Sequence, residues 1–172
     1  MSNNLKLSFN KIIKVANNFK GLDFRQQIIY QSNKLTVIND SKSTSFSATQ
    51  PLLDSFENIY WILGGLAKKG DQLKLKKKNF GKIKAFIYGK DKVFFSKILS
   101  NKVKYKTSKN LKYSLLLVFK DLRKRKEEKK IILFSPSAAS FDQFNNFEDR
   151  GKYFNKTIKN YLNKKNYYEK LF

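Results

Sequence analysis

Short apolar runs alternate with segments of helical periodicity along most of this chain of 172 residues. The apolar runs are too brief for helices, and each ends in glycine or in polar residues, as buried strands commonly do. Between them, apolar side chains recur at every third or fourth position, which indicates amphipathic helices. The pattern predicts strands at residues 27–31, 34–38, 59–63, 83–88, 103–105 and 131–134, and helices at residues 5–19, 46–56, 93–99, 111–122 and about 144–161.

Strands that alternate with helices predict an α/β fold, with a mainly parallel sheet covered by helices on both faces. The first two strands are separated only by Ser32 and Asn33, so we expect a β-hairpin there. Pro51 fits its helix only in the first turn or at a kink. Residues 73–80 are rich in lysine and weakly helical, and the charged run 121–130 is typical of solvated helix ends or loops. The length suits one domain.

Three of the predicted strands end in polar or glycine-rich loops, at residues 39–44, 64–68 and 135–141. Because the carboxyl ends of parallel strands lie at one edge of a sheet, we expect these loops to meet there. Ligands bind at this edge in open α/β sheets, and a following helix offers free N–H groups to an anion. The same residue types also suit plain helix caps and turns, and a lysine after a strand is often only solvated charge.

The formal net charge of +24 is compatible with binding to nucleic acid. The excess is almost entirely lysine, however, and it is spread from Lys6 to Lys170 among many Asn, Ile, Phe and Tyr residues. A/T-rich codons favour this residue set, so mutational bias explains the charge and nucleic acid is not the expected partner. The four arginines are Arg25, Arg123, Arg125 and Arg150. An arginine retained in such a chain indicates that its planar guanidinium group matters.

The chain has no cysteine and no histidine, which excludes disulfides, thiolate chemistry and cysteine-based zinc sites and removes the commonest general base. It also lacks the glycine-rich phosphate loops G-x-x-x-x-G-K-[ST] and G-x-G-x-x-G. No apolar run approaches the roughly 20 residues of a membrane span, and the N-terminus has no signal region. We therefore expect a cytoplasmic protein without a membrane span and without a metal site of its own.

What the predicted edge offers is positive charge and hydroxyl groups, with Asp40 as the only well-placed carboxylate. Such groups hold a small dianion or phosphates, and they do not transfer protons at neutral pH by themselves. The residues concerned are Arg25, Lys42, Thr44, Lys68 and Ser140.

Two strings carry a resemblance to a known family. Residues 39–44 (Asn-Asp-Ser-Lys-Ser-Thr) resemble the signature N-D-S-K-A-T, and residues 133–151 resemble L-L-S-P-A-x-A-S-x-D-Q-F-x-N-F-E-x-R-G. Both belong to the C-terminal domain of the Mur ligase family of peptidoglycan enzymes, in its D-glutamate-adding branch. Residues 59–68 are similar to the strand and G-G-x-x-K turn of that domain, and residues 21–25 stand where it has G-L-P-H-R. The likeness runs in the same order from about residue 19 to residue 154.

The resemblance implies a Rossmann-like domain at residues 21–165, preceded by a linker helix at residues 1–20 and followed by a tail at residues 166–172. The family uses ATP to convert the L-alanine carboxylate of UDP-N-acetylmuramoyl-L-alanine to an acyl phosphate, which the amine of D-glutamate attacks. The C-terminal domain brings D-glutamate and closes over the ATP site. ATP and Mg²⁺ would be bound mainly by a central domain, which this sequence lacks together with the N-terminal domain. We therefore expect this chain to be inactive alone.

By the same resemblance, the loop residues take separate roles. D-Glutamate would be held by Thr44, Lys68, Ser140, Phe141 and Phe147. The nucleotide would be faced by Arg25, Asp40 and Lys42, of which Arg25 and Lys42 would be catalytic. The chain departs from the family at Phe24, which replaces a histidine beside Arg25.

Two alternatives remain open at this point. The chain could be a separate basic module that binds polyanions or nucleic acid on a degenerate ligase domain, in which case binding would depend steeply on salt. It could also be a degenerate domain without activity.

Overall fold

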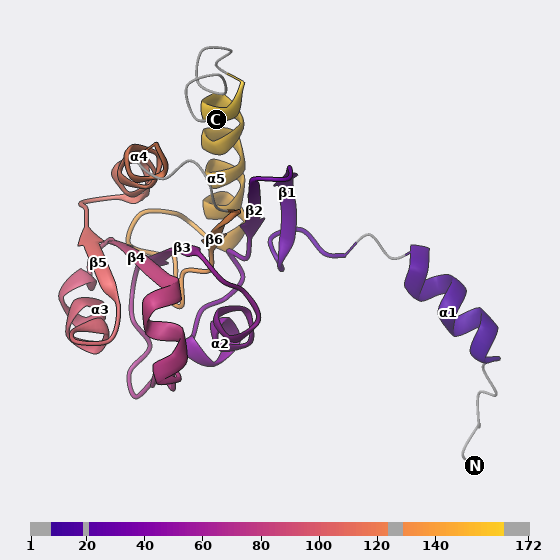
Figure 1. Cartoon of the computed structure of the whole chain (residues 1–172), viewed down its shortest axis with the longest axis horizontal. Coiled ribbons are helices and arrows are strands. Elements are labelled where there is room, and N and C mark those ends of the chain that lie inside the picture. The colour runs from indigo at the N-terminus through magenta and orange to yellow at the C-terminus, as the bar shows by residue number, and fades with distance from the viewer. Residues whose placement is uncertain (1–7, 19–20, 124–128, 164–172) are drawn as a thin grey trace.

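The computed structural model describes residues 8–18, 21–123 and 129–163, and its centre is a six-stranded sheet (Figure 1). The strand order is β1-β2-β6-β3-β4-β5, in which β1 is antiparallel to β2 and all other neighbours are parallel. This arrangement confirms the predicted α/β fold with its N-terminal hairpin. The strands are β1 (Gln27–Gln31), β2 (Leu35–Asn39), β3 (Ile59–Gly64), β4 (Ile83–Tyr88), β5 (Lys104–Thr107) and β6 (Lys130–Phe134).

Helices cover both faces of the sheet, α4 and α5 on one side and α2 and α3 on the other (Figure 1). The first helix, α1, lies apart from the sheet, and its Phe9 is 74% exposed. No helix among the described residues has both the length and the apolar character needed to cross a bilayer. The helices are α1 (Phe9–Asn18), α2 (Phe46–Ser55), α3 (Lys92–Leu99), α4 (Leu111–Leu122) and α5 (Phe147–Leu162), with a 3-10 helix, η1 (Lys77–Lys82).

The two faces of the sheet bury separate apolar clusters. Along β3 every residue is buried, as expected for a parallel strand that is covered on both faces. Its Tyr60 and Ile62 face α4 and α5, where the rings of Phe134 and Phe154 stack 4.3 Å apart. Its Trp61 belongs to the other cluster, packed edge-on against Phe46 of α2. Burial of each such ring stabilises the fold by roughly 1.5–3 kcal/mol, so the sheet holds its loops in fixed positions.

The charged run 121–130 is not solvated at its two ends, contrary to expectation. Asp121 and Lys130 are each 5% exposed. Burial alone would raise the pKa of Asp121, but hydrogen bonds and charge from Lys84 and Lys106 hold it below its ordinary value. Lys130 is buried because β6 begins there, one residue earlier than predicted. Residues 124–128 lie outside the described residues.

Three smaller predictions also need correction. The segment 73–80 is irregular up to Lys76, and the 3-10 helix that follows extends to Lys82. Pro51 is the sixth residue of α2 rather than part of the first turn, and the helix continues through it with the proline side chain exposed. The strand predicted at residues 103–105 lies at Lys104–Thr107.

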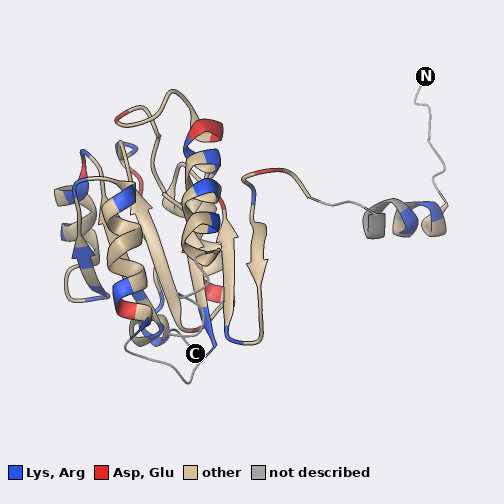
Figure 2. Ribbon diagram, turned by 90° about the horizontal axis from the view of Figure 1, so that it is seen from above, with Lys and Arg blue, Asp and Glu red and all other residues tan. Residues whose placement is uncertain are grey.

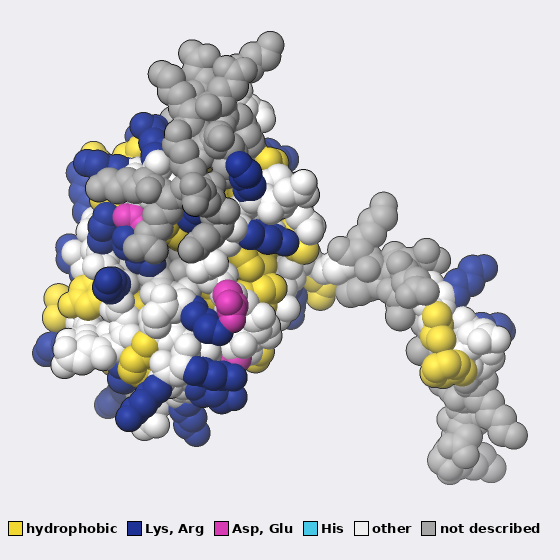
Figure 3. All heavy atoms as spheres, in the orientation of Figure 1, with side chains coloured by type: hydrophobic (Ala, Val, Ile, Leu, Met, Phe, Trp, Pro, Cys, Tyr) yellow, Lys and Arg dark blue, Asp and Glu magenta, His cyan; other side chains and the backbone are white. Residues whose placement is uncertain are grey.

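Lysine and arginine side chains are scattered over the visible surface of the molecule (Figure 3). On this face they form no single stripe of the kind that follows a nucleic-acid backbone. The distribution agrees with the interpretation that most of the positive charge is solvated.

A contact between Phe24 and Gly151 positions the segment before β1. Phe24 is 8% exposed and adopts a left-handed backbone conformation with φ of 61°. Its ring lies so close to α5 that a Cβ atom on Gly151 would approach Phe24 Cδ1 to 2.3 Å. The amide of Asn39 also donates to the Gly151 carbonyl at 3.0 Å. The absence of a side chain at position 151 therefore allows the hairpin to lie against α5.

We expect Gly151→Ala to lower the free energy of unfolding by about 1–3 kcal/mol, because the new methyl group would overlap the Phe24 ring. In an ordinary helix the same change would stabilise by about 1 kcal/mol. Urea unfolding measures the effect. The double variant Phe24→Ala/Gly151→Ala should lose less free energy of unfolding than the two single variants added together, since the new methyl group no longer overlaps the Phe24 ring. Gly81→Ala is the control, because a Cβ atom at position 81 would meet no other atom within 4 Å; an equal loss there would contradict the steric explanation.

Candidate functional site

The carboxyl ends of β2, β6 and β3 are adjacent, since these strands are neighbours and parallel. In Figure 2 the arrowheads of the parallel strands point to one edge, and that of β1 points the opposite way. The N–H of Asp40 donates to Phe134 O at 2.7 Å, and that of Gly64 donates to Pro136 O at 2.9 Å. We call the segments that follow the strands the β2 loop (residues 40–45), the β3 loop (residues 64–71) and the β6 loop (residues 135–146). Their predicted convergence is confirmed.

The paired glycines of the β3 loop are required by the closeness of two neighbouring backbones. Gly64 and Gly65 have φ angles of 135° and 130°. A Cβ atom on Gly64 would lie 2.0 Å from Tyr88 O, and one on Gly65 would lie 2.3 Å from Ala139 O. Only glycine combines this backbone conformation with this approach. Gly64 therefore allows the end of β3 to lie against the end of β4, and Gly65 allows the β3 loop to lie against the β6 loop.

Reciprocal hydrogen bonds hold Lys68 and Ser140 near each other along the backbone. Leu66 N–H donates to Ala139 O at 3.0 Å, and Ala139 N–H donates to Leu66 O at 2.9 Å. Ser140 follows this bridge at once, and Lys68 follows it after one residue. The bridge thus joins the two segments that carry Lys68 and Ser140, which were predicted to bind one ligand.

Asp71 joins the β3 loop to the start of α2. Its carboxylate accepts from Phe46 N–H at 2.6 Å, and its own N–H donates to Lys68 O at 3.2 Å. Ser45, the N-cap residue of α2, accepts from Ala48 N–H. Thr44, directly before this cap, is therefore tied through Asp71 to the turn that carries Lys68.

The side chains predicted to hold D-glutamate differ in exposure. Thr44 and Lys68 are exposed, Phe141 is 70% exposed, Phe147 is partly buried and Ser140 is buried. Within the described part of the chain, the side chains of Thr44, Lys68 and Ser140 form no hydrogen bond or ion pair with another residue. Thr44 and Lys68 are therefore open to a ligand, while Ser140 lies below the surface beside them in the β6 loop.

Lys42 lies over the Phe147 ring, with its Nζ atom 4.0 Å from the ring centroid. A cation–π contact of this kind is worth about 0.5–2 kcal/mol, depending on how far water is excluded. The contact joins the β2 loop to the first residue of α5. It also brings a residue predicted to face the nucleotide against one predicted to face D-glutamate.

The three residues predicted to face the nucleotide share one corner of the edge. Lys42 N–H donates to Phe24 O at 3.0 Å, and Gln26 N–H donates to Asp40 Oδ1 at 3.1 Å. Arg25 lies between these two attached residues, and its guanidinium group is exposed without a partner among the described residues. Arg25, Asp40 and Lys42 are thus brought together by one backbone hydrogen bond and by one that the Asp40 side chain accepts.

Asp40 itself is buried beneath this corner and is 6% exposed. Burial raises the pKa of its carboxyl group above the ordinary value, and hydrogen bonds from Ser135 and Gln26 act in the opposite direction. Both oxygen atoms accept from the protein, one from Gln26 N–H and the other from Ser135 Oγ at 2.7 Å. In this structure the Asp40 carboxylate accepts hydrogen bonds from two neighbouring segments, the one before β1 and the β6 loop.

A buried network of hydroxyl groups extends from Asp40. Thr49 Oγ1 lies 2.7 Å from each of Ser43 Oγ, Ser135 Oγ and Ser137 Oγ. A carboxylate can only accept, so Ser135 donates its single hydrogen to Asp40 and must accept from Thr49. Thr49 has then used its own hydrogen and accepts from the other two serines. The donors therefore follow one direction, toward Asp40, and they link α2 with the β2 and β6 loops.

Arg150 connects the same two loops from the other side. Its side chain is fully buried, with Nη1 donating to Ala138 O at 2.9 Å and Nη2 donating to Ser41 O at 2.7 Å. Its Nε donates to Ser41 Oγ at 3.1 Å, and that hydroxyl donates to Phe147 O at 2.8 Å. Among the described residues, no carboxylate lies within ion-pair distance of the guanidinium group. The planar guanidinium group of Arg150, which was predicted to matter, thus binds backbone carbonyl groups.

Tyr88, at the end of β4, is fully buried close to this guanidinium group. Burial raises the pKa of its hydroxyl group to about 12; Arg150 acts to lower it and Asp142 to raise it. Tyr88 therefore remains neutral in the folded protein at pH values where an exposed tyrosine ionises.

The sequence interpretation missed the polar residues beneath the loops. Ser41, Ser135 and Ser137 lie inside the two family strings, so their position was visible, although their contacts were not. Thr49 had no signal in the sequence, because a threonine inside a helix is unremarkable until its partners are known. Asn39 was visible as the first residue of a string, but its hydrogen bond to Asn155 at 2.7 Å joins residues far apart in the chain.

The described residues contain no group of three or more Asp, Glu, His or Cys side chains that could hold a metal ion. The chemistry available at the edge is therefore binding by ammonium, guanidinium, hydroxyl and backbone N–H groups. Such groups suit carboxylates and phosphates.

No protein-family model matches the chain. Individual proteins do match it, and each of those described here is a UDP-N-acetylmuramoylalanine--D-glutamate ligase. The ligase of Wolbachia sp. subsp. Brugia malayi is 38% identical over 151 residues, which cover 87% of this chain and 30% of the relative. That of Rickettsia prowazekii is 36% identical over 154 residues, covering 89% and 34%. That of Francisella tularensis strain SCHU S4 is 35% identical over 158 residues, covering 90% and 37%. The chain spans about a third of the length of these curated relatives.

Replacing Arg150 should destabilise the fold strongly. In Arg150→Met, the carbonyl groups of Ser41 and Ala138 lose their buried donor, at a cost of about 1–3 kcal/mol each. We expect the free energy of unfolding in urea to fall by about 3 kcal/mol. Arg150→Lys should lie between this variant and the wild type, because an ammonium group cannot reach all three acceptors. The exposed Arg25, changed to Met, should alter stability by less than about 0.5 kcal/mol. Wild-type stability in Arg150→Met would refute the role given to the guanidinium group.

Alkaline pH should weaken the fold through Tyr88. Between pH 10 and about 12 the unfolded chain releases this proton while the folded protein retains it, so the free energy of unfolding falls as the pH rises. The contribution is at most about 1.4 kcal/mol for each pH unit. Urea unfolding of wild type and Tyr88→Phe over this range measures it, because lysine titration is common to both proteins. Parallel curves for the two proteins would contradict the prediction.

Proposed function

Because this chain is a homologue of the UDP-N-acetylmuramoylalanine--D-glutamate ligases over about a third of their length, we propose that it serves as their C-terminal domain. In this role it binds D-glutamate and closes over the ATP site of a complete ligase in peptidoglycan synthesis. Residues 21–165 form the domain, residues 1–20 the linker helix and residues 166–172 a tail. The apolar Phe9 and Ile13 of α1 are exposed in this chain and suit a helix that packs on another part of the ligase.

The single observation that carries the proposal is the set of unused polar side chains on a tightly bonded edge. D-Glutamate has two carboxylates at neutral pH, and these suit an ammonium group and hydroxyl donors. Lys68, Thr44 and Ser140 provide such groups on loops that hydrogen bonds join to one another. Phe141 and Phe147 add apolar surface that shapes the pocket around the short carbon chain of the amino acid.

The corner formed by Arg25, Asp40 and Lys42 serves the nucleotide side of the proposed reaction. Transfer of a phosphoryl group from ATP activates the L-alanine carboxylate of UDP-N-acetylmuramoyl-L-alanine as an acyl phosphate. Arg25 and Lys42 are cations placed to neutralise negative charge on phosphate oxygens as the domain closes. The Lys42–Phe147 contact connects this corner to the D-glutamate side, so closure would position both substrates together.

Mg²⁺ and most of the ATP would be held by parts of the ligase outside this chain, since the described residues offer no acidic cluster. Without those parts, the 172 residues would bind D-glutamate weakly and would not complete the ligation.

Lys68→Ala, in a complete ligase that carries this chain, should raise the KM for D-glutamate by about tenfold or more, equivalent to at least about 1.4 kcal/mol. The ammonium group would no longer face a substrate carboxylate. Steady-state kinetics with D-glutamate varied and the other substrates saturating would measure the change. Ser140→Ala should raise the same KM by a smaller factor, because it removes one neutral donor.

The neighbouring Lys69 is the matched control, because it is also exposed and its replacement by Ala removes the same charge. It should leave the KM within about twofold of the wild type. An unchanged KM in Lys68→Ala, or equal effects of the two substitutions, would reject the proposed D-glutamate site.

A further inference from the structure

A cavity lies at the edge of the sheet opposite to the three loops, where the parallel arrows of Figure 2 begin. Its volume is about 630 Å³, within the range of about 300–1,000 Å³ that is usual for small-ligand sites. The described residues that line it include no Asp or Glu. They do include five lysines, which come from η1, β4, β6 and the β5 region: Lys82, Lys84, Lys102, Lys104 and Lys130.

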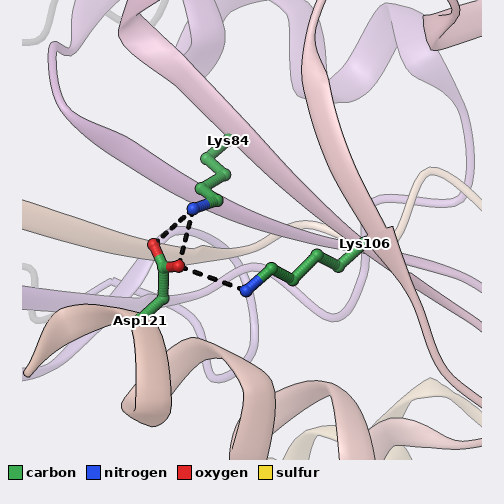
Figure 4. Close-up of polar contacts among 3 residues, drawn as sticks. All are labelled: Lys84, Lys106 and Asp121. Carbon is green, nitrogen blue, oxygen red and sulfur yellow. Dashed lines mark hydrogen bonds and ion pairs between the residues drawn. The ribbon is translucent and has the colours of Figure 1, made fainter. Parts of the chain in front are cut away.

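Two of these lysines oppose each other in the sheet. Lys84 of β4 and Lys104 of β5 are register partners on neighbouring strands. Like charges placed directly opposite destabilise a sheet, so the fold alone gives no reason for this pair. Figure 4 shows the carboxylate of Asp121, which accepts from Lys84 at 2.6 Å and from Lys106 at 3.2 Å. Lys104 has no acidic partner among the described residues.

Within the described part of the chain, the ion pairs at this edge leave some of its lysines without an acidic partner. Lys82 pairs with Glu57, whose side chain is 68% exposed, and exposed pairs contribute little. Lys102 is exposed and pairs with no acidic residue in the described chain. Among the described residues, Lys82, Lys84, Lys102, Lys104 and Lys106 thus outnumber the carboxylates that they contact, Glu57 and Asp121.

The end of α3 points toward this edge, and helix carbonyl groups there could in principle require cations. Two of those carbonyls, Leu99 O and Ser96 O, already have backbone partners. Lys102 N–H and Val103 N–H both donate to Leu99 O at 3.0 Å, and Ser100 N–H donates to Ser96 O at 2.9 Å. These two carbonyls therefore do not require the ammonium groups of Lys102 and Lys104.

We propose that this cavity binds an anion that carries two or more phosphoryl groups, with Lys102 and Lys104 as its main contacts. Lysine ammonium groups are point charges that suit phosphate oxygens, and several of them around one cavity favour a multiply charged ligand over a single carboxylate. The site is separated from the D-glutamate edge by the length of the strands. It does not rest on the ligase function proposed above.

Inorganic triphosphate is the probe for this site, titrated into the isotope-labelled full chain at low salt while backbone amide signals are followed. We expect saturable shifts at residues 82–84 and 101–104. The double variant Lys102→Gln/Lys104→Gln should weaken the dissociation constant by about tenfold or more. Lys112→Gln/Lys152→Gln removes the same charge from exposed positions on α4 and α5 and should weaken it by less than about threefold.

Equal weakening by the two double variants would overturn the proposal, since it would indicate general attraction to a basic protein. Absence of saturable shifts up to about 10 mM triphosphate would overturn it as well. A single-stranded oligodeoxynucleotide then distinguishes two sources of the same chemistry. Displacement of triphosphate identifies a nucleic-acid backbone, and no displacement identifies a free phosphate compound.

Thermal unfolding without triphosphate provides a second measurement. Lys104→Gln should raise the midpoint of unfolding, because it removes the repulsion from Lys84. A lower midpoint would show that Lys104 stabilises the fold and would overturn the argument that it is kept for binding.

Discussion

The buried guanidinium group of Arg150 is the interaction on which the arrangement of the loops depends. It is fully enclosed and bonded to the backbone of both the β2 and β6 loops. A buried charge is costly unless its donors are well used, and here each of Nε, Nη1 and Nη2 has an acceptor. The separation of the loops is thereby set by the dimensions of one rigid, planar group.

The other contacts at this edge build on that separation. Gly64 lets β3 end close to β4, Gly65 lets the β3 loop approach the β6 loop, and Gly151 lets the segment before β1 lie on α5. The three places share a physical reason, since a Cβ atom at any of these glycines would lie within 2.3 Å of a neighbouring atom. A side chain is thus excluded at each of these three contacts, while the exposed Lys68 has no side-chain partner in the described part of the chain.

Much of the fold could be predicted from the sequence because the central strands are continuous apolar runs that end abruptly. Ile59 to Leu63 could hardly be anything except a covered strand, and the convergence of three loops followed from parallel order. The burial of the ends of the charged run could not be predicted, because Asp121 pairs with Lys84, which lies 37 residues away along the chain. The role of Thr49 likewise depends on serines 86 and 88 residues away. The proposed ligand roles came from family strings, since local pattern alone left Lys68 indistinguishable from a solvated lysine.

The hydroxyl network has a consequence for the electrostatics of the edge. With Asp40 ionised, hydrogen counting permits one orientation for Thr49 and Ser135, so these dipoles cannot rotate independently. Water at an open surface must reorient whenever a charge arrives, and that reorganisation costs free energy. Dipoles that are already fixed avoid this cost. The polar groups beneath the loops are numerous, but they should therefore reorient little when a charge arrives at the edge.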